Sequence, residues 1–518
     1  MKICLIKPPV LHKESSVSLM PSPPLGLAYI AAALKNSGHS VQVIDATAEG
    51  FNDVEEFQNE VYLFGLNSKG IINLIEKDTD IICFSFMFTN NWLYDRYLVK
   101  EVEKKFPESV LIAGGEHVTA APEYSLKQAR GLDFIVIGEG EATIVDLVTA
   151  LQTKSDLKDV GNIAYLKEED FIIQKGGKVS RIKEIEGIAW PAWELFPLEK
   201  YFSNKVSYGV FRGNTLPVMA SRGCPYECTF CSSPQMWGRN YSIRSPKDFV
   251  DEIEHLYKKY NVTNFELYDL TAIIYKTWII DTAKEIINRG LKITYQIPAG
   301  TRAEAIDYEV AQWLYKSGCK NITYAPESGS EKMLKKIKKK VKLEKMLDSI
   351  KHSSKANLNI KLNIIIGYPD ETHLDILKTI WFLVKCSWYG ANDTSPAVFS
   401  PYPGSNLFER LIKEKKLDIY DDNYLMEIIN SYDLWPGKVY SNNVSPIFVR
   451  FYSVITMIIF YMSNYLFRPH RFFNTMKNIY TKNYESRAEL ALSKILFKIR
   501  APKQRKRTIT EVKEVTSY

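Results

Sequence analysis

Short apolar runs alternate with amphipathic segments through most of the sequence, and this alternation restricts the fold more than any other feature. Asp80–Met87 is an almost continuous apolar run, as expected for a strand that is buried on both faces. Pro24–Asn36 and Asn91–Phe106 lie between such runs and have helical periodicity. We therefore predict that residues 1–152 form an α/β domain with a doubly wound parallel sheet, Rossmann-like or flavodoxin-like, whose ligand lies at the carboxyl ends of the strands.

A second alternating series occupies residues 207–416 and contains about six strand–helix units. Eight units close a standard barrel of this kind, so about six units predict an open, partial (βα)6 barrel of the TIM type. Residues 153–206 are predicted to be a linker with a small hairpin around Asn162–Gln174. Residues 417–518 are predicted to be a mainly helical C-terminal extension that ends in a basic tail.

The net charge of +7 is concentrated near the C-terminus. From Arg468 onward the chain has thirteen Lys or Arg and four Asp or Glu residues, a balance of +9, which leaves about −2 for the rest. The two α/β regions are therefore not expected to bind nucleic acid. The basic segment Lys503–Arg507 has two interpretations, contact with an anionic membrane surface and a solvated tail. Phe451–Phe467 has no charge but is short for a membrane span, so a buried or interfacial helix is expected.

Three of the seven cysteines, Cys224, Cys228 and Cys231, fall within eight residues after the predicted strand Leu216–Ser221. Thiolates are soft ligands that suit zinc or iron–sulfur clusters. A structural zinc ion takes four ligands, and the nearest downstream histidine, His255, falls in a predicted helix. A [4Fe–4S] cluster held by three cysteines leaves one iron open to a further ligand. We expect such a cluster, with a zinc site and three buried thiols as the alternatives.

The remaining cysteines are scattered and are expected to behave as small buried apolar residues. They are Cys4, Cys83, Cys319 and Cys386. Neither a disulfide framework nor a secretory signal at Met1–Pro8 is indicated. We therefore expect a cytoplasmic protein, with peripheral contact at the inner membrane face as a further option.

With Phe230 as the aromatic residue, the spacing CxxxCxΦC resembles the hallmark of the radical SAM superfamily. In that superfamily the open iron binds the amino and carboxylate groups of S-adenosylmethionine (SAM), and a 5′-deoxyadenosyl radical derived from SAM abstracts hydrogen from an unactivated carbon. Other segments resemble the subgroup with an N-terminal cobalamin (B12)-binding domain. These are Pro23–Leu27, Gly114–His117, Gly138–Glu141, Pro326–Ser330, Gly367–Thr372 and Pro401–Ser405. The resemblance implies an enzyme with three cofactors: a [4Fe–4S] cluster, SAM and cobalamin.

Candidate contacts to SAM and cobalamin lie at the ends of the predicted strands. The candidates for SAM have loop or helix capping as the alternative role. They are Phe230, Tyr268, Asp269, Gln296, Arg302, Glu327 and Ser328. The candidates for cobalamin include glycines, which allow a ligand to approach the backbone closely. They are Leu25, Gly26, Thr89, Asn90, Gly114, Gly115, His117, Glu139 and Gly140. The Asp-x-His-x-x-Gly signature of other cobalamin proteins is absent, so no protein histidine is expected on the lower face of cobalt.

The resemblance implies a methyltransferase that acts through methylcobalamin on an unactivated carbon. Its substrate is expected to be a small-molecule or lipid-like biosynthetic intermediate, and its electron donor a protein such as flavodoxin or ferredoxin. Cyclisation, rearrangement or oxygen insertion without net methylation are the alternative reactions. A non-catalytic corrinoid or redox sensor is the alternative from another class, and formation of 5′-deoxyadenosine would exclude it.

Overall fold

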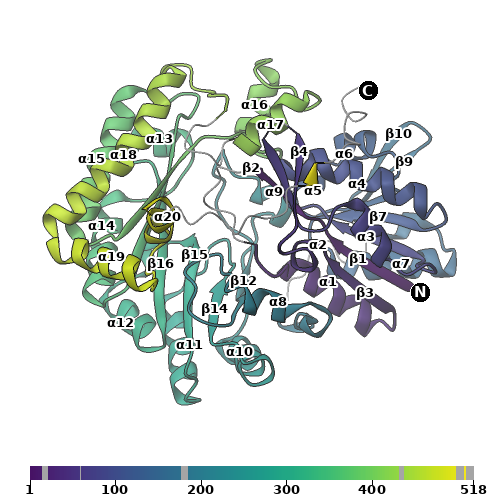
Figure 1. Cartoon of the computed structure of the whole chain (residues 1–518), viewed down its shortest axis with the longest axis horizontal. Coiled ribbons are helices and arrows are strands. Elements are labelled where there is room, and N and C mark those ends of the chain that lie inside the picture. The colour runs from purple at the N-terminus through teal and green to yellow at the C-terminus, as the bar shows by residue number, and fades with distance from the viewer. Residues whose placement is uncertain (14–20, 59, 177–184, 431–436, 497–506, 509–518) are drawn as a thin grey trace.

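The computed structural model describes residues 1–13, 21–58, 60–176, 185–430, 437–496 and 507–508, which form two α/β units side by side (Figure 1). The first unit contains a seven-stranded sheet in the order β10-β9-β8-β7-β6-β1-β3. Its strands are β1 (Lys2–Lys7), β3 (Ser40–Asp45), β6 (Ile81–Ser85), β7 (Val110–Gly114), β8 (Phe134–Val136), β9 (Ile163–Lys167) and β10 (Asp170–Gln174). The five strands from β3 to β8 are parallel, which confirms the predicted doubly wound sheet.

The antiparallel hairpin of β9 and β10 extends this sheet at its β8 edge. The N-terminal unit therefore continues to Gln174, beyond the boundary predicted at residue 152. The polar residues that follow α7 (Glu141–Thr153) indicated a linker, but they are only the turn that leads into the hairpin. Helices α1 (Leu25–Asn36) and α4 (Trp92–Lys105) cover the sheet with apolar faces.

A small second sheet in the N-terminal unit was not predicted from the sequence. It consists of β2 (Val10–Lys13), β4 (Val54–Gln58) and β5 (Val61–Phe64), joined by β19 (Arg507–Thr508) from the far end of the chain. Thus Arg507, predicted as part of a basic tail, pairs with β4, while residues 503–506 lie outside the described residues.

The second unit is a sheet of six parallel strands in sequential order, as predicted for a partial barrel. The strands are β11 (Thr215–Val218), β14 (Asn264–Leu267), β15 (Thr294–Thr301), β16 (Cys319–Glu327), β17 (Asn359–Ile366) and β18 (Asp393–Val398). The helices that follow them are α10 (Pro246–Tyr260), α11 (Lys276–Asn288), α12 (Tyr308–Lys316), α14 (Leu343–Lys355) and α15 (His373–Tyr389). Each helix buries an apolar side against the strands, which fixes the strand ends on one rim.

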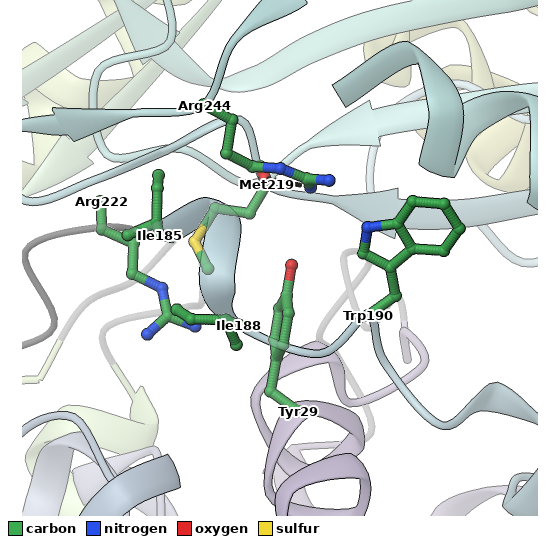
Figure 2. Close-up of a pocket in the computed structure, with 7 residues that line it drawn as sticks. All are labelled: Tyr29, Ile185, Ile188, Trp190, Met219, Arg222 and Arg244. Atoms are coloured by element: carbon green, nitrogen blue, oxygen red, sulfur yellow. Dashed lines mark hydrogen bonds between the residues drawn. The ribbon is translucent and has the colours of Figure 1, made fainter. Parts of the chain in front are cut away.

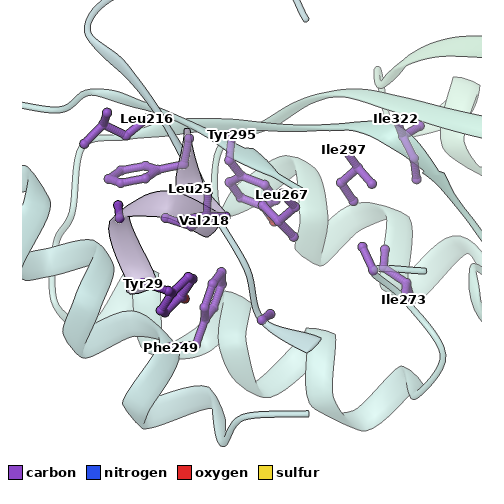
Figure 3. Close-up of a cluster of buried hydrophobic side chains, with 14 of the residues drawn as sticks. Leu25, Tyr29, Leu216, Val218, Phe249, Leu267, Ile273, Tyr295, Ile297 and Ile322 are labelled. Carbon is purple, nitrogen blue, oxygen red and sulfur yellow. The ribbon is translucent and has the colours of Figure 1, made fainter. Parts of the chain in front are cut away.

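One hydrophobic core joins the two units. Leu25 and Tyr29 on α1 pack beside Leu216, Val218 and Phe249 of the barrel (Figure 3). Because apolar area buried between domains favours a fixed arrangement, the two units form one body.

The C-terminal extension is helical, as predicted, and together with a helix at residues 406–413, which falls inside the range predicted for the barrel, its helices form two groups. Helices α16 (Asn406–Lys413) and α17 (Asp422–Asn430) lie between the two units, whereas α18 (Pro446–Phe467), α19 (Pro469–Thr481) and α20 (Arg487–Leu496) lie on the barrel (Figure 1). Helix α18 packs against α15 and β18, in the place that a sixth barrel helix would occupy. Among the described residues, α18 is the one helix whose length and composition would suffice to cross a membrane, and 17% of its most apolar window is buried.

Candidate functional site

The cysteine loop follows the first barrel strand at the carboxyl rim. It runs from the short strand β12 (Ser221–Arg222) to helix α9 (Ser233–Trp237). Cys224, Cys228 and Cys231 in this loop are partly exposed. The other four cysteines are buried, as predicted, and burial raises the pKa of Cys319 to about 12. Exposure therefore separates the three candidate ligands from the cysteines that only fill space.

Backbone hydrogen bonds hold the middle of the cysteine loop. The N–H of Thr229 donates to the carbonyl of Ile337 at 3.0 Å, and its carbonyl accepts from the N–H of Leu407 at 2.9 Å. The N–H of Cys231 donates to the carbonyl of Cys228 at 3.1 Å, which closes a turn. The loop is thus fixed between the segment after β16 and helix α16.

The geometry of the thiols fits a cluster better than a single metal ion. Within the described part of the chain, no three side chains of His, Cys, Asp or Glu converge closely enough to hold one ion. Zinc requires four ligands at about 2.0–2.3 Å from one centre, whereas a cubane places each thiolate on a different iron and needs no such convergence. Each outer thiol has a hydroxyl neighbour: Cys224 Sγ lies 3.6 Å from Thr271 Oγ1, and Cys231 Sγ lies 3.2 Å from Ser233 Oγ.

Phe230 packs the cysteine loop against the last barrel units. The ring centroids of Phe230 and Tyr368 are 5.8 Å apart. Lys339 Nζ lies over the face of the Phe230 ring, 5.9 Å from its centroid. Lys339 Nζ is also 3.0 Å from Glu327 Oε1. Burial raises the pKa of Glu327, and the ammonium group of Lys339 opposes this rise. Glu327 therefore already has a cationic partner beside the cysteine loop.

Two of the other SAM candidates contact the cysteine loop or its stem. The carboxylate of Asp269 accepts from the N–H groups of Ala220 and Ser221 at 3.2 and 2.5 Å, and it also accepts from the Ser221 hydroxyl. The Arg302 guanidinium lies 4.1 Å from the ring centroid of Tyr226, inside the loop. Asp269 therefore fixes the residues just before the cysteine loop, and Arg302 contacts the loop itself.

The remaining SAM candidates have other partners. Ser328 is fully buried and its hydroxyl lies 3.1 Å from that of Thr379, so it fixes the turn after β16. The amide of Gln296 accepts from the Val210 N–H at 2.9 Å and donates to the Val210 carbonyl at 2.7 Å. The hydroxyl of Tyr268 donates to Ser22 Oγ at 2.7 Å. These three side chains hold segments of the protein in place.

The sequence did not predict that other segments of the chain close the barrel from inside; we call this closure the closed floor. The Glu266 carboxylate accepts from the Ser207 hydroxyl and the Gly209 N–H, both at 2.6 Å, so the segment that precedes β11 passes through the barrel interior. Glu485 continues this closure, because its carboxylate accepts from Asn359 and its carbonyl from Asn321, both near the starts of strands. The one indication in the sequence was the carboxylate of Glu266, which lies within the strand Asn264–Leu267 and needs a polar partner when buried.

The cysteine loop is joined directly to the N-terminal unit. Arg222, 4% exposed, lies 2.5 Å from Glu141 and 3.6 Å from Glu139, and the Ser232 hydroxyl donates to Glu116. Sequence reasoning included Glu139 but missed Arg222, whose partners lie about eighty residues away in the chain.

A small cavity lies beside this junction. Figure 2 shows Tyr29, on α1, pointing into it between Arg222 and Arg244. Its volume is about 10 Å³, which is room for about one water molecule. The cavity is therefore part of the domain contact and is too small for a substrate.

The cobalamin candidates lie at the carboxyl rim of the N-terminal sheet, in two environments. Leu25 and Gly26 begin α1, and a Cβ added at Gly26 would meet nothing within 4 Å. Gly114 ends β7 and is similarly open, with only the Val136 carbonyl at 4.0 Å. At Gly140 a Cβ would approach Ile30 to 2.9 Å. The open glycines leave backbone accessible to a large ligand.

Thr89, Asn90 and His117 form the buried part of this rim, and Gly115, which is half-buried, lies just before His117. His117 is 1% exposed, its Nδ1 is 3.1 Å from Thr89 Oγ1, and its ring centroid is 4.6 Å from that of Trp92. Burial lowers the pKa of His117 to about 3. Within the described residues, His117 Nε2 and Asn90 Oδ1 have no hydrogen-bond partner. Orphaned buried polar atoms of this kind fit a rim that receives a polar ligand.

Comparison with known proteins adds two family matches. The B12 binding domain family matches residues 16–148, and the radical SAM superfamily matches residues 218–383. The uncharacterized methyltransferase PH0819 of Pyrococcus horikoshii is 32% identical over 419 residues, which cover 80% of this chain and 84% of that protein. The cytidylyl-2-hydroxyethylphosphonate methyltransferase of Streptomyces wedmorensis is 28% identical over 453 residues, which cover 80% and 83%.

A solved structure has the same fold. It is the radical S-adenosylmethionine methyltransferase TsrM of Kitasatospora setae, with cobalamin and a [4Fe–4S] cluster bound. The TM-score is 0.62 at 15% sequence identity, and the match covers 80% of this chain and 75% of TsrM. The arrangement of a sheet domain in front of a partial barrel is therefore shared.

Proposed function

The chain belongs to the radical SAM superfamily and to its B12-binding branch, and on this premise we propose that it transfers a methyl group to an unactivated carbon. As a radical SAM enzyme of this branch, it uses a [4Fe–4S] cluster, SAM and cobalamin. Its relatives include methyltransferases. The proposed substrate is a small-molecule or lipid-like biosynthetic intermediate, and the proposed electron donor is a protein such as flavodoxin or ferredoxin.

One observation carries the proposal: the cysteine loop and the rim of the N-terminal sheet that holds the cobalamin candidates share part-buried polar contacts. Arg222 and Ser232, at the two ends of the loop, bond Glu141 and Glu116 on the rim. When bound at these two places, the cofactors supply a hydrogen-abstracting radical and a transferable methyl group. Because the same residues hold both places, a substrate in the mouth of the barrel lies within reach of both.

The protein's own residues position the cofactors and exclude water. We assign the cluster to Cys224, Cys228 and Cys231, with Phe230 and Asp269 fixing the loop that carries them. The rim glycines Gly26 and Gly114, together with Asn90, are assigned to cobalamin. The closed floor at Glu266 keeps solvent out of the barrel interior, where a carbon radical would otherwise be quenched.

Arg302 is proposed to orient SAM indirectly: its guanidinium group lies over the Tyr226 ring and so holds the cysteine loop in place. Glu327, paired with Lys339, is proposed to set the charge beside the cluster. The predicted contact of Gln296 with SAM is not part of the proposal, because its amide is bonded to Val210.

Anaerobic reconstitution tests the proposal. The holoenzyme should contain iron, sulfide and corrinoid, and with cell extract as substrate source it should convert SAM to 5′-deoxyadenosine and S-adenosylhomocysteine. Cys228→Ala should lose iron and SAM cleavage, whereas Cys319→Ala, which removes a buried thiol elsewhere, should retain both.

The products decide between the reactions. Formation of 5′-deoxyadenosine without S-adenosylhomocysteine would replace methyl transfer by cyclisation, rearrangement or oxygen insertion. Zinc in place of iron in the anaerobically purified protein, or full activity of Cys228→Ala, would overturn the cluster assignment.

A further inference from the structure

Helix α18 exposes a continuous apolar stripe. The outward side chains at the spacing of successive turns are all apolar: Ile447, Phe451, Ile458, Met462 and Leu466. Ile447 and Leu466, at the two ends, are 77% and 76% exposed. At 1.5 Å per residue the stripe is about 29 Å long. Soluble helices normally turn charged residues outward, so this stripe marks a contact surface.

The opposite side of α18 is fastened to the barrel. The Asn464 amide donates to the Ala391 carbonyl and the Tyr461 hydroxyl to Asp393, both at 2.5 Å, while Val449 and Phe460 are fully buried. These contacts hold α18 along the barrel, with the stripe facing outward.

Helix α15 widens the exposed surface. His373 contacts Phe448 at one end of the helix pair, with centroids 5.3 Å apart, and Trp388 contacts Phe467 at the other, at 5.0 Å. The two helices therefore run parallel and side by side, at the outer flank of the barrel away from the N-terminal unit (Figure 1). Exposed side chains of α15 and α19 extend the stripe into what we call the apolar face. Its further members are Leu374, Leu377, Trp381, Trp388, Phe472 and Phe473.

The exposed charges on the three helices of the apolar face have one sign. In α15, α18 and α19 the single acidic residue is Asp375, which is buried and accepts from the Ser330 and Thr372 hydroxyls. The exposed charged residues of the three helices are lysines, at Lys378, Lys385 and Lys477. The neighbouring helix α14 instead exposes both signs, including Glu344 and Asp348. Anionic headgroups complement a surface of this kind, and tryptophan favours the headgroup level.

We propose that the apolar face docks the protein on an anionic lipid bilayer, with α18 and α15 lying in the plane of the interface. A second copy of the chain fits less well, because a symmetric contact of α15, α18 and α19 with the same three helices would bring their lysines together, and these helices offer no exposed acidic partner. At the edge of the face, a groove of about 710 Å³ lies between α14 and α15; aromatic residues line its α15 side, and the charged residues Glu344, Asp348 and Lys385 also line it, so it marks the polar border of the face.

Docking through the apolar face deepens the proposed function in one respect, because it brings the enzyme to a membrane in which a lipid-like substrate would lie. That link rests on the proposed function, whereas the docking itself requires no turnover. Binding and SAM cleavage are therefore measured on the same holoenzyme, and each can fail without the other.

Vesicle flotation tests the docking. The holoenzyme should float with vesicles of phosphatidylcholine and phosphatidylglycerol, and less with phosphatidylcholine alone. Lys378→Gln/Lys385→Gln should weaken binding to the anionic vesicles about thirty-fold, since each lysine near the surface contributes about 1 kcal/mol. Phe451→Gln/Met462→Gln should weaken binding to both. Ile287→Gln replaces an exposed apolar residue on α11 and should bind as the unmodified enzyme does.

Fluorescence gives a second readout that does not depend on the folding of these variants. Brominated-lipid vesicles should quench the emission of the holoenzyme, and Trp381→Phe/Trp388→Phe should remove most of the quenching. A holoenzyme that cleaves SAM but neither floats nor is quenched overturns the docking alone. So does a dimer in solution that the Phe451→Gln/Met462→Gln substitutions dissociate.

Discussion

Replacement of Arg222 by methionine tests whether the domain junction depends on a buried charge. The guanidinium group is 4% exposed, faces Glu141 and Glu139, and lies 5.1 Å from the ring centroid of Tyr29. Methionine retains much of the side-chain length but leaves two buried carboxylates facing each other without a cation. Removal of one partner of a buried pair costs about 3–5 kcal/mol, and we expect Arg222→Met to lower the free energy of unfolding by about that amount.

Arg130→Met is the matched control. Arg130 and Glu169 lie 2.9 Å apart, but their side chains are 55% and 79% exposed. An exposed pair of this kind contributes about 0–1 kcal/mol, so this variant should be almost as stable as the unmodified protein. In Arg222→Met/Glu141→Leu one of the two opposed carboxylates is also removed, so part of the lost stability should return.

Urea unfolding of the full chain, followed by circular dichroism, measures these differences. The first transition is the one to compare, because two domains need not unfold in a single step. Corrinoid content after reconstitution should fall with Arg222→Met, because the rim loses its tie to the cysteine loop. Equal midpoints for Arg222→Met and Arg130→Met would refute the reasoning.

Three further predictions concern a titrating carboxyl and two rim glycines. Burial raises the pKa of Glu371 from its ordinary value of 4.5 to about 8, so the stability it contributes is complete below pH 4.5 and is lost as the pH rises through about 8. Glu371→Gln should therefore gain stability relative to the unmodified protein over that window in urea titrations, and a difference independent of pH would contradict the assignment. Gly26→Ala, with nothing within 4 Å of the added methyl group, should leave unfolding unchanged but lower corrinoid uptake; unchanged uptake would exclude close approach at Gly26. Gly115→Ala, at φ 120° and with the Phe86 carbonyl oxygen 2.5 Å from the new Cβ, should lose at least about 1–3 kcal/mol in the same unfolding assay.

The periodicity of the sequence predicted most of the framework because that signal is local. The β6 strand, Ile81–Ser85, is buried at nearly every position, and the six barrel strands follow one another in chain order. The cysteine spacing predicted the candidate cluster because its three ligands lie on one loop. In each case the residues that determine the feature are neighbours in the chain.

Contacts between distant segments could not be predicted in this way. Arg222 meets Glu141 across about eighty residues, and nothing near either residue indicates the other. Gln296 lies at a strand position that suggested a SAM contact, but the segment that takes its amide, at Val210, precedes the barrel. The strand β4, Val54–Gln58, is too polar to predict from pattern and forms because β5 and β19 pair with it.

The segment that precedes β11 and the residue Glu485 restrict how small molecules can enter and leave the barrel. Ser207–Val210 and Glu485 bond to side chains of β14, β15 and β17, and we therefore expect small molecules to enter at the other end of the barrel, under the N-terminal unit. Substrate entry and nucleoside release are then expected to take place at the same rim. We therefore expect product release to contribute to the turnover rate.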